Sequence, residues 1–164
     1  MSLSNPSIAV DPAASSTKPD SRFDAERIRH QFPSYLQAKK RWLCWRFEYR
    51  DKQGKWSKVP VNPNRPQSHG SSTDENQWVD FETAVDVVQR HAGQCDGVGY
   101  VFSSGDGIVG VDLDHCLDAE GDFLGKAGRL VEQLNTYTER SVSGDGVHAI
   151  LLGALPEKGN NRKK

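Results

Sequence analysis

Cysteine is scarce in this sequence, and the three that occur, Cys44, Cys95 and Cys116, form no closely spaced pair. The CxxC pairs of zinc ribbons and redox motifs are therefore excluded, and no disulfide framework is indicated. Unpaired thiols are typical of a reducing compartment, so we expect a cytoplasmic protein without disulfide bonds.

Long apolar runs are also missing. No stretch approaches the roughly 20 apolar residues that a membrane-spanning helix needs, so we expect no membrane partner. Residues 1–21 are rich in Ser, Pro and Ala and have neither a basic start nor an apolar run. We expect them to form a disordered tail and not a signal peptide, and we expect residues 157–164 to form a basic C-terminal tail.

The formal net charge of −1 conceals two oppositely charged stretches. Residues 39–65 carry nine basic side chains against two acidic ones, whereas residues 74–122 carry twelve acidic side chains against one basic. The first stretch is suited to attract phosphate groups, and the second is suited to attract cations.

The pattern of apolar residues predicts one α+β domain over residues 22–156, with a mostly antiparallel sheet and flanking helices. One or two short helices are expected within residues 22–40. The aromatic run 42–49, the turn after it and the run 55–61 predict a β-hairpin.

The second half of the sequence alternates helix and strand signals. Asp80 is placed to cap a helix that ends near Gly93. Strands at 97–102 and 108–113 flank a turn of Ser, Gly and Asp, so we expect them to pair as an antiparallel hairpin. The remaining expected elements are a helix at 127–135 and strands at 137–143 and 147–152.

Two aspartates stand two residues apart at the end of the segment IVGVDLD, residues 108–114. Because successive side chains of a strand point to opposite faces, Asp112 and Asp114 share one face. Two acids this close repel each other unless a cation compensates, and hard oxygen ligands suit Mg²⁺ or Mn²⁺. The pair is a candidate metal site, and a solvated strand end with two surface aspartates is the alternative.

Other metals fit this region less well. Acids recur at short spacing after Asp112, but Cys116 and Leu117 stand where a calcium loop needs an oxygen ligand and a glycine. The nearby histidines and cysteines lack the pair spacing of a zinc site. By strand alternation His115 falls on the Leu113 side, so we expect it to pack or cap.

A second cluster lies in residues 137–148, YTERSVSGDGVH. Gly144 and Gly146 should leave backbone N–H groups free to face an anion, and Ser143 and His148 flank that loop. The hydroxyl, the loop and the imidazole together form a candidate phosphate cradle. The alternative is that His148 is a hydrogen-bonded core residue of an apolar strand.

The two clusters together resemble the N-terminal catalytic domain of bifunctional DNA primase-polymerases of phages and plasmids, in the archaeo-eukaryotic primase superfamily. VGVDLDHC resembles the DxD motif of that family, and YTERSVSGDGVH resembles its S-x-H motif. The upstream segments WRFEYRDKQGKWSKVPVNP, WVDF and GVGYVFS also look like the family. The resemblance covers roughly residues 40–156.

This resemblance implies a template-directed nucleotidyltransferase in a replication protein of a phage, a plasmid or another mobile element. Asp112 and Asp114 would hold two Mg²⁺ or Mn²⁺ ions, and His148 would be a further catalytic residue. Ser143, His148 and the glycines of the loop, Gly144 and Gly146, would contact the nucleotide triphosphate. The implied fold is the primase-polymerase type, with its RNA-recognition-motif-like half incomplete here.

The implied partners are nucleoside triphosphates, template DNA and a replicative helicase. Lys58 is a candidate nucleotide contact. The basic residues that are candidates for the DNA path are Arg41, Arg46, Arg50 and Lys52. The tryptophans among them, Trp42, Trp45 and Trp56, either stack on bases or belong to the core.

The family places a third metal-binding aspartate on a strand after the S-x-H strand, and we expect this chain to be truncated before it. Two further functions therefore stay open. One is a catalytically inactive fragment that binds nucleotide or DNA, and the other is a metal-dependent phosphohydrolase. Hydrolysis of nucleoside triphosphates without a template distinguishes the phosphohydrolase.

Overall fold

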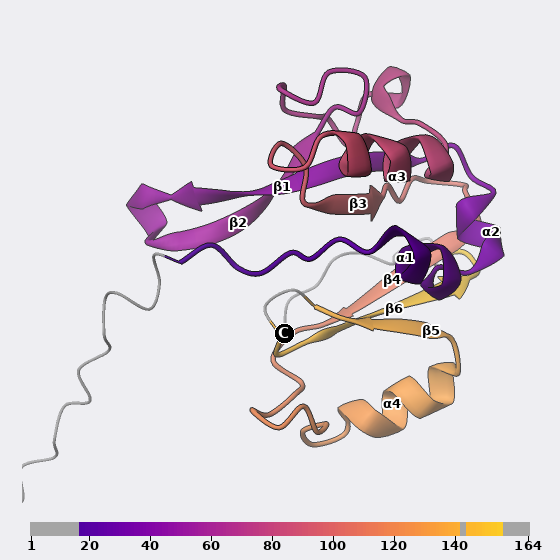
Figure 1. Cartoon of the computed structure of the whole chain (residues 1–164). Helices are drawn as coiled ribbons and strands as arrows, with labels where there is room; N and C mark the ends of the chain where they lie inside the picture. The colour runs from indigo at the N-terminus through magenta and orange to yellow at the C-terminus, as the bar shows by residue number, and fades with distance from the viewer. Residues whose placement is uncertain (1–16, 142–143, 156–164) are drawn as a thin grey trace, which may run out of the picture. The chain divides into compact units, whose positions relative to one another are not determined.

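The computed structural model describes residues 17–141 and 144–155 and divides the chain into two compact units, Met1–Val101 and Phe102–Lys164. Each unit contains one three-stranded sheet, of order β2-β1-β3 in the first and β4-β6-β5 in the second (Figure 1). All four strand pairings in these sheets are antiparallel, so the expected α+β class with antiparallel sheets is confirmed. None of the helices in the described ranges combines the length and apolar character that a membrane span requires.

The first sheet is built on a long hairpin. Strand β1 (Trp42–Arg50) pairs with β2 (Lys55–Val61) along its length, and β3 (Gly97–Tyr100) pairs with the start of β1. A short 3₁₀ turn and Gly54, with φ of 59°, connect β1 to β2. Glycine adopts this left-handed conformation without steric cost, which explains the tight reversal. The expected hairpin is confirmed.

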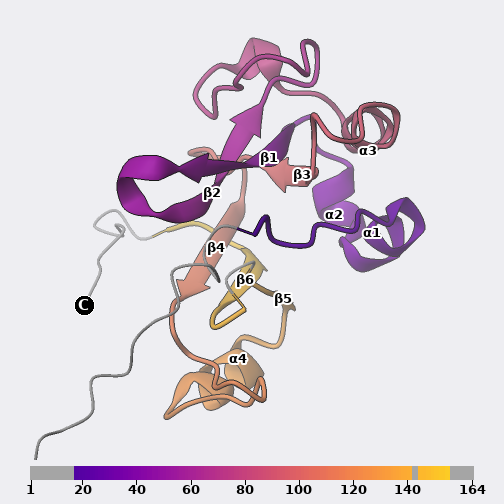
Figure 2. The same ribbon diagram turned by 60° about the vertical axis from the view of Figure 1, so that its left-hand side comes forward.

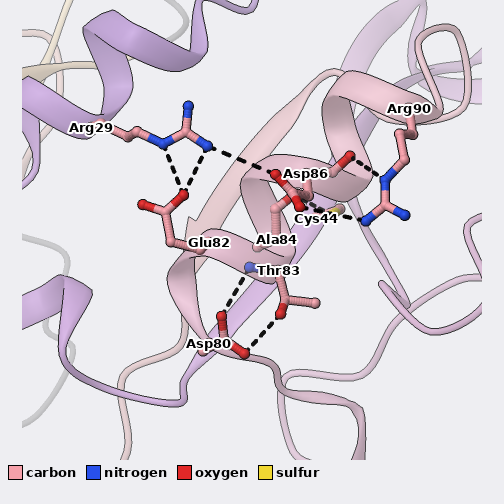
Figure 3. Close-up of polar contacts among 8 residues, drawn as sticks. All are labelled: Arg29, Cys44, Asp80, Glu82, Thr83, Ala84, Asp86 and Arg90. Atoms are coloured by element: carbon pink, nitrogen blue, oxygen red, sulfur yellow. Dashed lines mark hydrogen bonds and ion pairs between the residues drawn. The ribbon is translucent and has the colours of Figure 1, made fainter.

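Helix α3 (Phe81–Arg90) packs on the first sheet, where its apolar residues are buried. Asp80 caps the helix by accepting hydrogen bonds from Thr83 N and Thr83 Oγ1, at 2.9 and 2.8 Å (Figure 3). The thiol of Cys44 on β1 points to Ala84 O at 3.7 Å, which marks the face that the helix covers. The capped helix after Asp80 is confirmed.

Two short helices, α1 (Ala25–Gln31) and α2 (Ser34–Gln37), precede the sheet, and both agree with the expectation for this region. Arg29 on α1 forms ion pairs with Glu82 at 2.8 Å and Asp86 at 3.7 Å on α3 (Figure 3).

Trp42 is the centre of the first core. Its side chain is fully buried, and its ring meets those of Phe32, Phe81 and Tyr100 edge to face at 4.8–5.4 Å. Such aromatic contacts add to the stabilisation that burial gives. Of the two alternatives for Trp42, the structure therefore supports the core position, since a fully buried ring is not available to stack on a nucleobase.

The second sheet comprises β4 (Ile108–Leu113), β5 (Tyr137–Arg140) and β6 (Val147–Leu152). Helix α4 (Ala127–Leu134) lies on one face of it (Figure 2). Val147 forms a small core on that face with Cys116 and Leu117, and the partly buried residues packed against it are Leu113, Ala127 and Val131.

The expected hairpin of residues 97–102 and 108–113 is wrong. Strand β3 pairs with β1, and β4 pairs with β6 in the other sheet. The glycines of β3 help to explain its pairing with β1, because the indole of Trp45 on β1 lies across them. A Cβ at Gly97 would come within 2.6 Å of that ring, so only glycine fits beneath it. The turn between the two strands is present, but a local turn signal does not determine strand partners.

Candidate functional site

The central strand of the second sheet brings the two sequence clusters together. His148 on β6 lies opposite Asp112 on β4 and opposite Glu139 on β5. Side chains that are directly paired across antiparallel strands lie on the same face. The three side chains therefore form one row across the sheet, which we call the Asp112–His148–Glu139 row.

The imidazole of His148 sits between the two carboxylates of this row. Its Nδ1 lies 3.3 Å from Glu139 Oε1, and its Nε2 lies 3.6 Å from Asp112 Oδ1. A carboxylate only accepts, so this contact is a hydrogen bond when Nδ1 of His148 carries the proton. The approach to Asp112 is longer than a hydrogen bond and is an ion-pair contact. The ring therefore directs Nε2 toward Asp112 and away from Glu139.

The row occupies the sheet face that α4 does not cover. The residues next to it in each strand, such as Leu113 and Val147, point to the helix side and form the small core there. The Asp112 side chain is 65% exposed, and His148 and Glu139 are half-buried. An exposed carboxylate beside a partly buried imidazole is accessible to a polar ligand.

Asp114 follows the last residue of β4 and is exposed in a turn. The turn continues through His115, whose φ of 51° lies in the left-handed region. His115 is exposed, and its Nδ1 lies 2.5 Å from Asp145 Oδ2 in the glycine loop. The expectation that His115 packs beside Leu113 is wrong, because strand alternation stops where the chain turns.

The glycine loop is held by its own hydrogen bonds. Gly144 N–H donates to Ser141 O at 3.0 Å, and Gly146 N–H donates to Ser141 Oγ at 3.0 Å. The expectation that these two N–H groups are free to face an anion is therefore wrong in this conformation. Ser143, the expected phosphate contact, lies outside the described residues.

Gly146 has a steric role instead. A Cβ at this position would lie 2.7 Å from Leu113 O and 3.4 Å from Asp114 Cα. Glycine lets the loop approach the end of β4 closely, which places the S-x-H segment beside the DxD segment. The two motifs are therefore neighbours in space because of strand register and this close approach.

The chemical type of the ligands at the end of β4 suits a hard cation. Asp112 and Asp114 supply carboxylate oxygens, which Mg²⁺ and Mn²⁺ prefer. Across the described part of the chain, however, no three His, Cys, Asp or Glu side chains gather closely enough to hold a metal ion. The acidic segment after Asp114 forms a tight turn and not a calcium loop, because Asp118 N–H donates to Asp122 O and Asp122 N–H donates to Asp118 Oδ1.

The basic residues of the first unit that are candidates for contacting nucleotide or DNA differ in their surroundings. Lys58 is exposed, and its Nζ lies 4.3 Å from the ring centroid of Trp45, a cation–π distance. Arg41 lies 5.1 Å from the ring of Trp78 in the same way. Arg50 and Lys52 are exposed near the end of the β1–β2 hairpin.

Arg46 is part of an ion-pair network. It contacts Glu48 Oε1 at 2.7 Å and donates to Pro66 O, and His69 Nε2 lies 2.7 Å from the same carboxylate oxygen. The hydrogen bond from His69, followed by that from Arg46, holds the pKa of Glu48 below its ordinary value. These contacts give Arg46 a structural role in the hairpin.

Sequence reasoning missed Glu139 as a site residue. The signal was the strand period of two, because Tyr137 and Glu139 must share a face when residues 137–140 form a strand. Tyr137 Oη donates to Glu139 Oε2 at 2.9 Å, which agrees with that period. The pairing of Glu139 with His148 depends on register, which the sequence alone did not provide.

Comparison with known proteins identifies the family. No family model matches the chain. The DNA primase-polymerase of Nitratiruptor phage NrS-1 is 37% identical to it over 117 residues, which is 71% of this chain and 15% of that protein. The chain thus spans about 15% of the length of that relative. The matched part of this chain belongs to the family of phage DNA primase-polymerases.

Proposed function

We propose that this chain carries the nucleotidyl-transfer site of a template-directed DNA primase-polymerase. The observation that carries the proposal is the direct pairing of Asp112 with His148, which come from two separate motifs. A carboxylate pair at the end of a strand, next to an imidazole, is suited to bind the phosphates of a nucleotide together with a cation.

Asp112 and Asp114 would hold the divalent ions, Mg²⁺ or Mn²⁺. Bound there, such ions would supply Lewis-acid stabilisation of the charge that develops on the nucleotide phosphates. The exposure of both carboxylates supports the assignment, since the ligand must enter from solvent. Beside these two carboxylates, His148 would contact the nucleotide directly, because its Nε2 can donate to a phosphate oxygen when it is protonated.

Ser143 remains a proposed triphosphate contact, and Gly144 and Gly146 are proposed to shape the loop that presents it. Lys58 is proposed as a further nucleotide contact. Arg50 and Lys52, which are exposed, are better placed for template DNA than Arg46, whose guanidinium is engaged with Glu48. Arg41 stays a candidate of the same kind.

At the level of the whole protein, we infer the primase-polymerase fold with an incomplete RNA-recognition-motif-like half. We also infer one domain over residues 22–156 and a role in replication of a phage, a plasmid or another mobile element. Nucleoside triphosphates, template DNA and a replicative helicase are the proposed partners. Support for these inferences is the similarity to the phage protein, whose name states primase and polymerase activity.

The test is calorimetric binding of a nonhydrolysable nucleoside triphosphate in the presence and absence of Mn²⁺. Hydrogen bonds to charged groups contribute about 1.5–3 kcal/mol, so Asp114→Ala and His148→Ala should each weaken Mn²⁺-dependent binding roughly 10- to 100-fold. Glu132→Gln is the control, because it removes an exposed carboxylate from α4. Equal affinity in all four proteins would refute the proposed site.

Two assays then separate the possible activities. Template-dependent primer synthesis by the chain supports the nucleotidyltransferase. Binding without synthesis supports a nucleotide- or DNA-binding fragment, and template-independent release of phosphate supports a phosphohydrolase.

A further inference from the structure

The Asp112–His148–Glu139 row contains one residue whose role the proposed function does not explain. Glu139 is not one of the two proposed metal ligands, yet it contacts His148 directly. Its side chain is half-buried on the same sheet face, and its second oxygen accepts a hydrogen bond from Tyr137 Oη. Both oxygens of Glu139 are therefore engaged in defined contacts.

The geometry fixes the direction of these contacts. Strand pairing sets Glu139 opposite His148 in adjacent strands, so the two side chains meet without any long reach. The Tyr137 hydroxyl lies two residues away on the same strand face and holds Oε2, while Oε1 remains turned to the imidazole. The carboxylate is thus anchored on one side and is a fixed acceptor on the other.

A fixed acceptor at Nδ1 determines how an imidazole presents its other nitrogen. When Nδ1–H donates to a carboxylate, the ring plane and the position of Nε2 are set by that hydrogen bond. Carboxylate–imidazole pairs of this kind also orient histidines that bind metals, and losing the carboxylate costs about 10- to 100-fold in affinity or activity. In this chain Nε2 is directed to Asp112, the proposed metal and phosphate side.

We propose that Glu139 is a positioning residue, anchored by Tyr137, that holds His148 with Nδ1 protonated and Nε2 directed toward the nucleotide phosphates. The nucleotide part of this statement rests on the proposed function. The contact that orients the ring does not, because it lies between Glu139 on β5 and His148 on β6.

The first experiment measures the ring directly. Long-range ¹H–¹⁵N spectra of the full chain give the two ring nitrogen shifts of His148, assigned by the signals that disappear in His148→Ala. We expect Nδ1 of the wild type to keep a protonated-type shift even at alkaline pH. In Glu139→Ala, neutral His148 should shift toward the Nε2–H tautomer, which free imidazole side chains prefer in water.

The same spectra provide a control variant and the results that would refute the positioning role of Glu139. Glu132→Gln, on the helix at the other face of the sheet, should leave the His148 shifts unchanged. An unprotonated Nδ1 in the wild type, or identical His148 shifts in the wild type and Glu139→Ala, would overturn the positioning role. Glu139→Gln keeps the shape of the side chain, so it provides the comparison if Glu139→Ala does not fold.

The second experiment asks whether Glu139 acts through His148. In Mn²⁺-dependent binding of a nonhydrolysable nucleoside triphosphate, Glu139→Ala should weaken the affinity about tenfold, and Glu139→Gln less, because its amide oxygen can still accept from Nδ1–H. The double variant Glu139→Ala/His148→Ala should bind no more weakly than His148→Ala alone. Additive losses would show that Glu139 acts independently and would overturn the proposal.

These two experiments separate failure of the inference from failure of the proposed function. A wild-type chain that binds no nucleotide, but whose Nδ1 proton depends on Glu139, would refute the proposed function and retain the positioning role. A chain that binds nucleotide while Glu139→Ala changes neither the spectra nor the affinity would refute the positioning role and retain the function.

Discussion

The close approach of the glycine loop to β4 gives a prediction that can be worked from distances. In Gly146→Ala the new Cβ would lie 2.7 Å from Leu113 O, a separation that real Cβ atoms essentially never show. The atom it meets is backbone, and Leu113 is paired with Val147 in the sheet. Leu113 and Val147 cannot move apart to make room without weakening the pairing of β4 with β6. Overpacking of this kind costs about 1–3 kcal/mol.

The assay must observe the second unit specifically. All four tryptophans lie in the first unit, so tryptophan fluorescence does not report on this change. Amide hydrogen exchange of peptides that contain β4 and β6 does report on it. Since 1.4 kcal/mol corresponds to a factor of ten, a loss of 1–3 kcal/mol should speed their exchange roughly 5- to 150-fold.

Gly153→Ala is the matched control. A Cβ there would meet no atom within 4 Å, and the backbone of this glycine is not in the left-handed region. We expect unchanged or slightly slower exchange, because alanine restricts the unfolded chain. Equal exchange rates in Gly146→Ala and the wild type would refute the steric account of the loop.

Other predictions concern the site and the first unit. Asp112→Ala and Asp114→Ala should each weaken Mn²⁺ binding measured by electron paramagnetic resonance while the circular dichroism spectrum is retained; unchanged binding in both would contradict the metal assignment. Gly97→Ala should destabilise the first unit by about 1–3 kcal/mol in urea denaturation followed by tryptophan fluorescence, because the indole across it cannot yield without loss of packing. Asp80→Ala should remove a helix cap and cost about 1 kcal/mol in the same assay. Backbone and side-chain hydrogen bonds from Thr83 hold the pKa of Asp80 below its ordinary value of 3.8, so its contribution should be complete above that pH and be lost as the pH falls through the lower folded-state value. A wild type and an Asp80→Ala variant that differ equally at pH 6 and pH 2 would contradict this sign.

The sequence predicted local structure well. The β1–β2 hairpin and the Asp80-capped helix depend on residues within a few positions of each other, and both were expected from those residues. The position of Asp112 on an exposed strand face followed from the period of two in the same way. These features need no knowledge of which distant segments pair.

Features that depend on distant partners could not be predicted. The hairpin expected between residues 97–102 and 108–113 failed because β3 finds its partner in β1, where glycines accommodate Trp45. Glu139 was not selected because its contact with His148 requires the β5–β6 register. The expectation for His115 failed because β4 ends at Leu113, two residues before the position to which alternation was extended.

The strand order of the second sheet has a consequence for synthesis of the protein. Strand β6 is the last of the three along the chain, but it is the central one, and both β4 and β5 pair only with it. While a ribosome makes the chain from its N-terminus, β4 emerges with its DxD motif and finds no strand to pair with until Val147–Leu152 has followed. The first unit, whose strands are all complete by Tyr100, can fold during that interval. The proposed catalytic carboxylates therefore acquire their structure late, in one step with the histidine that faces them.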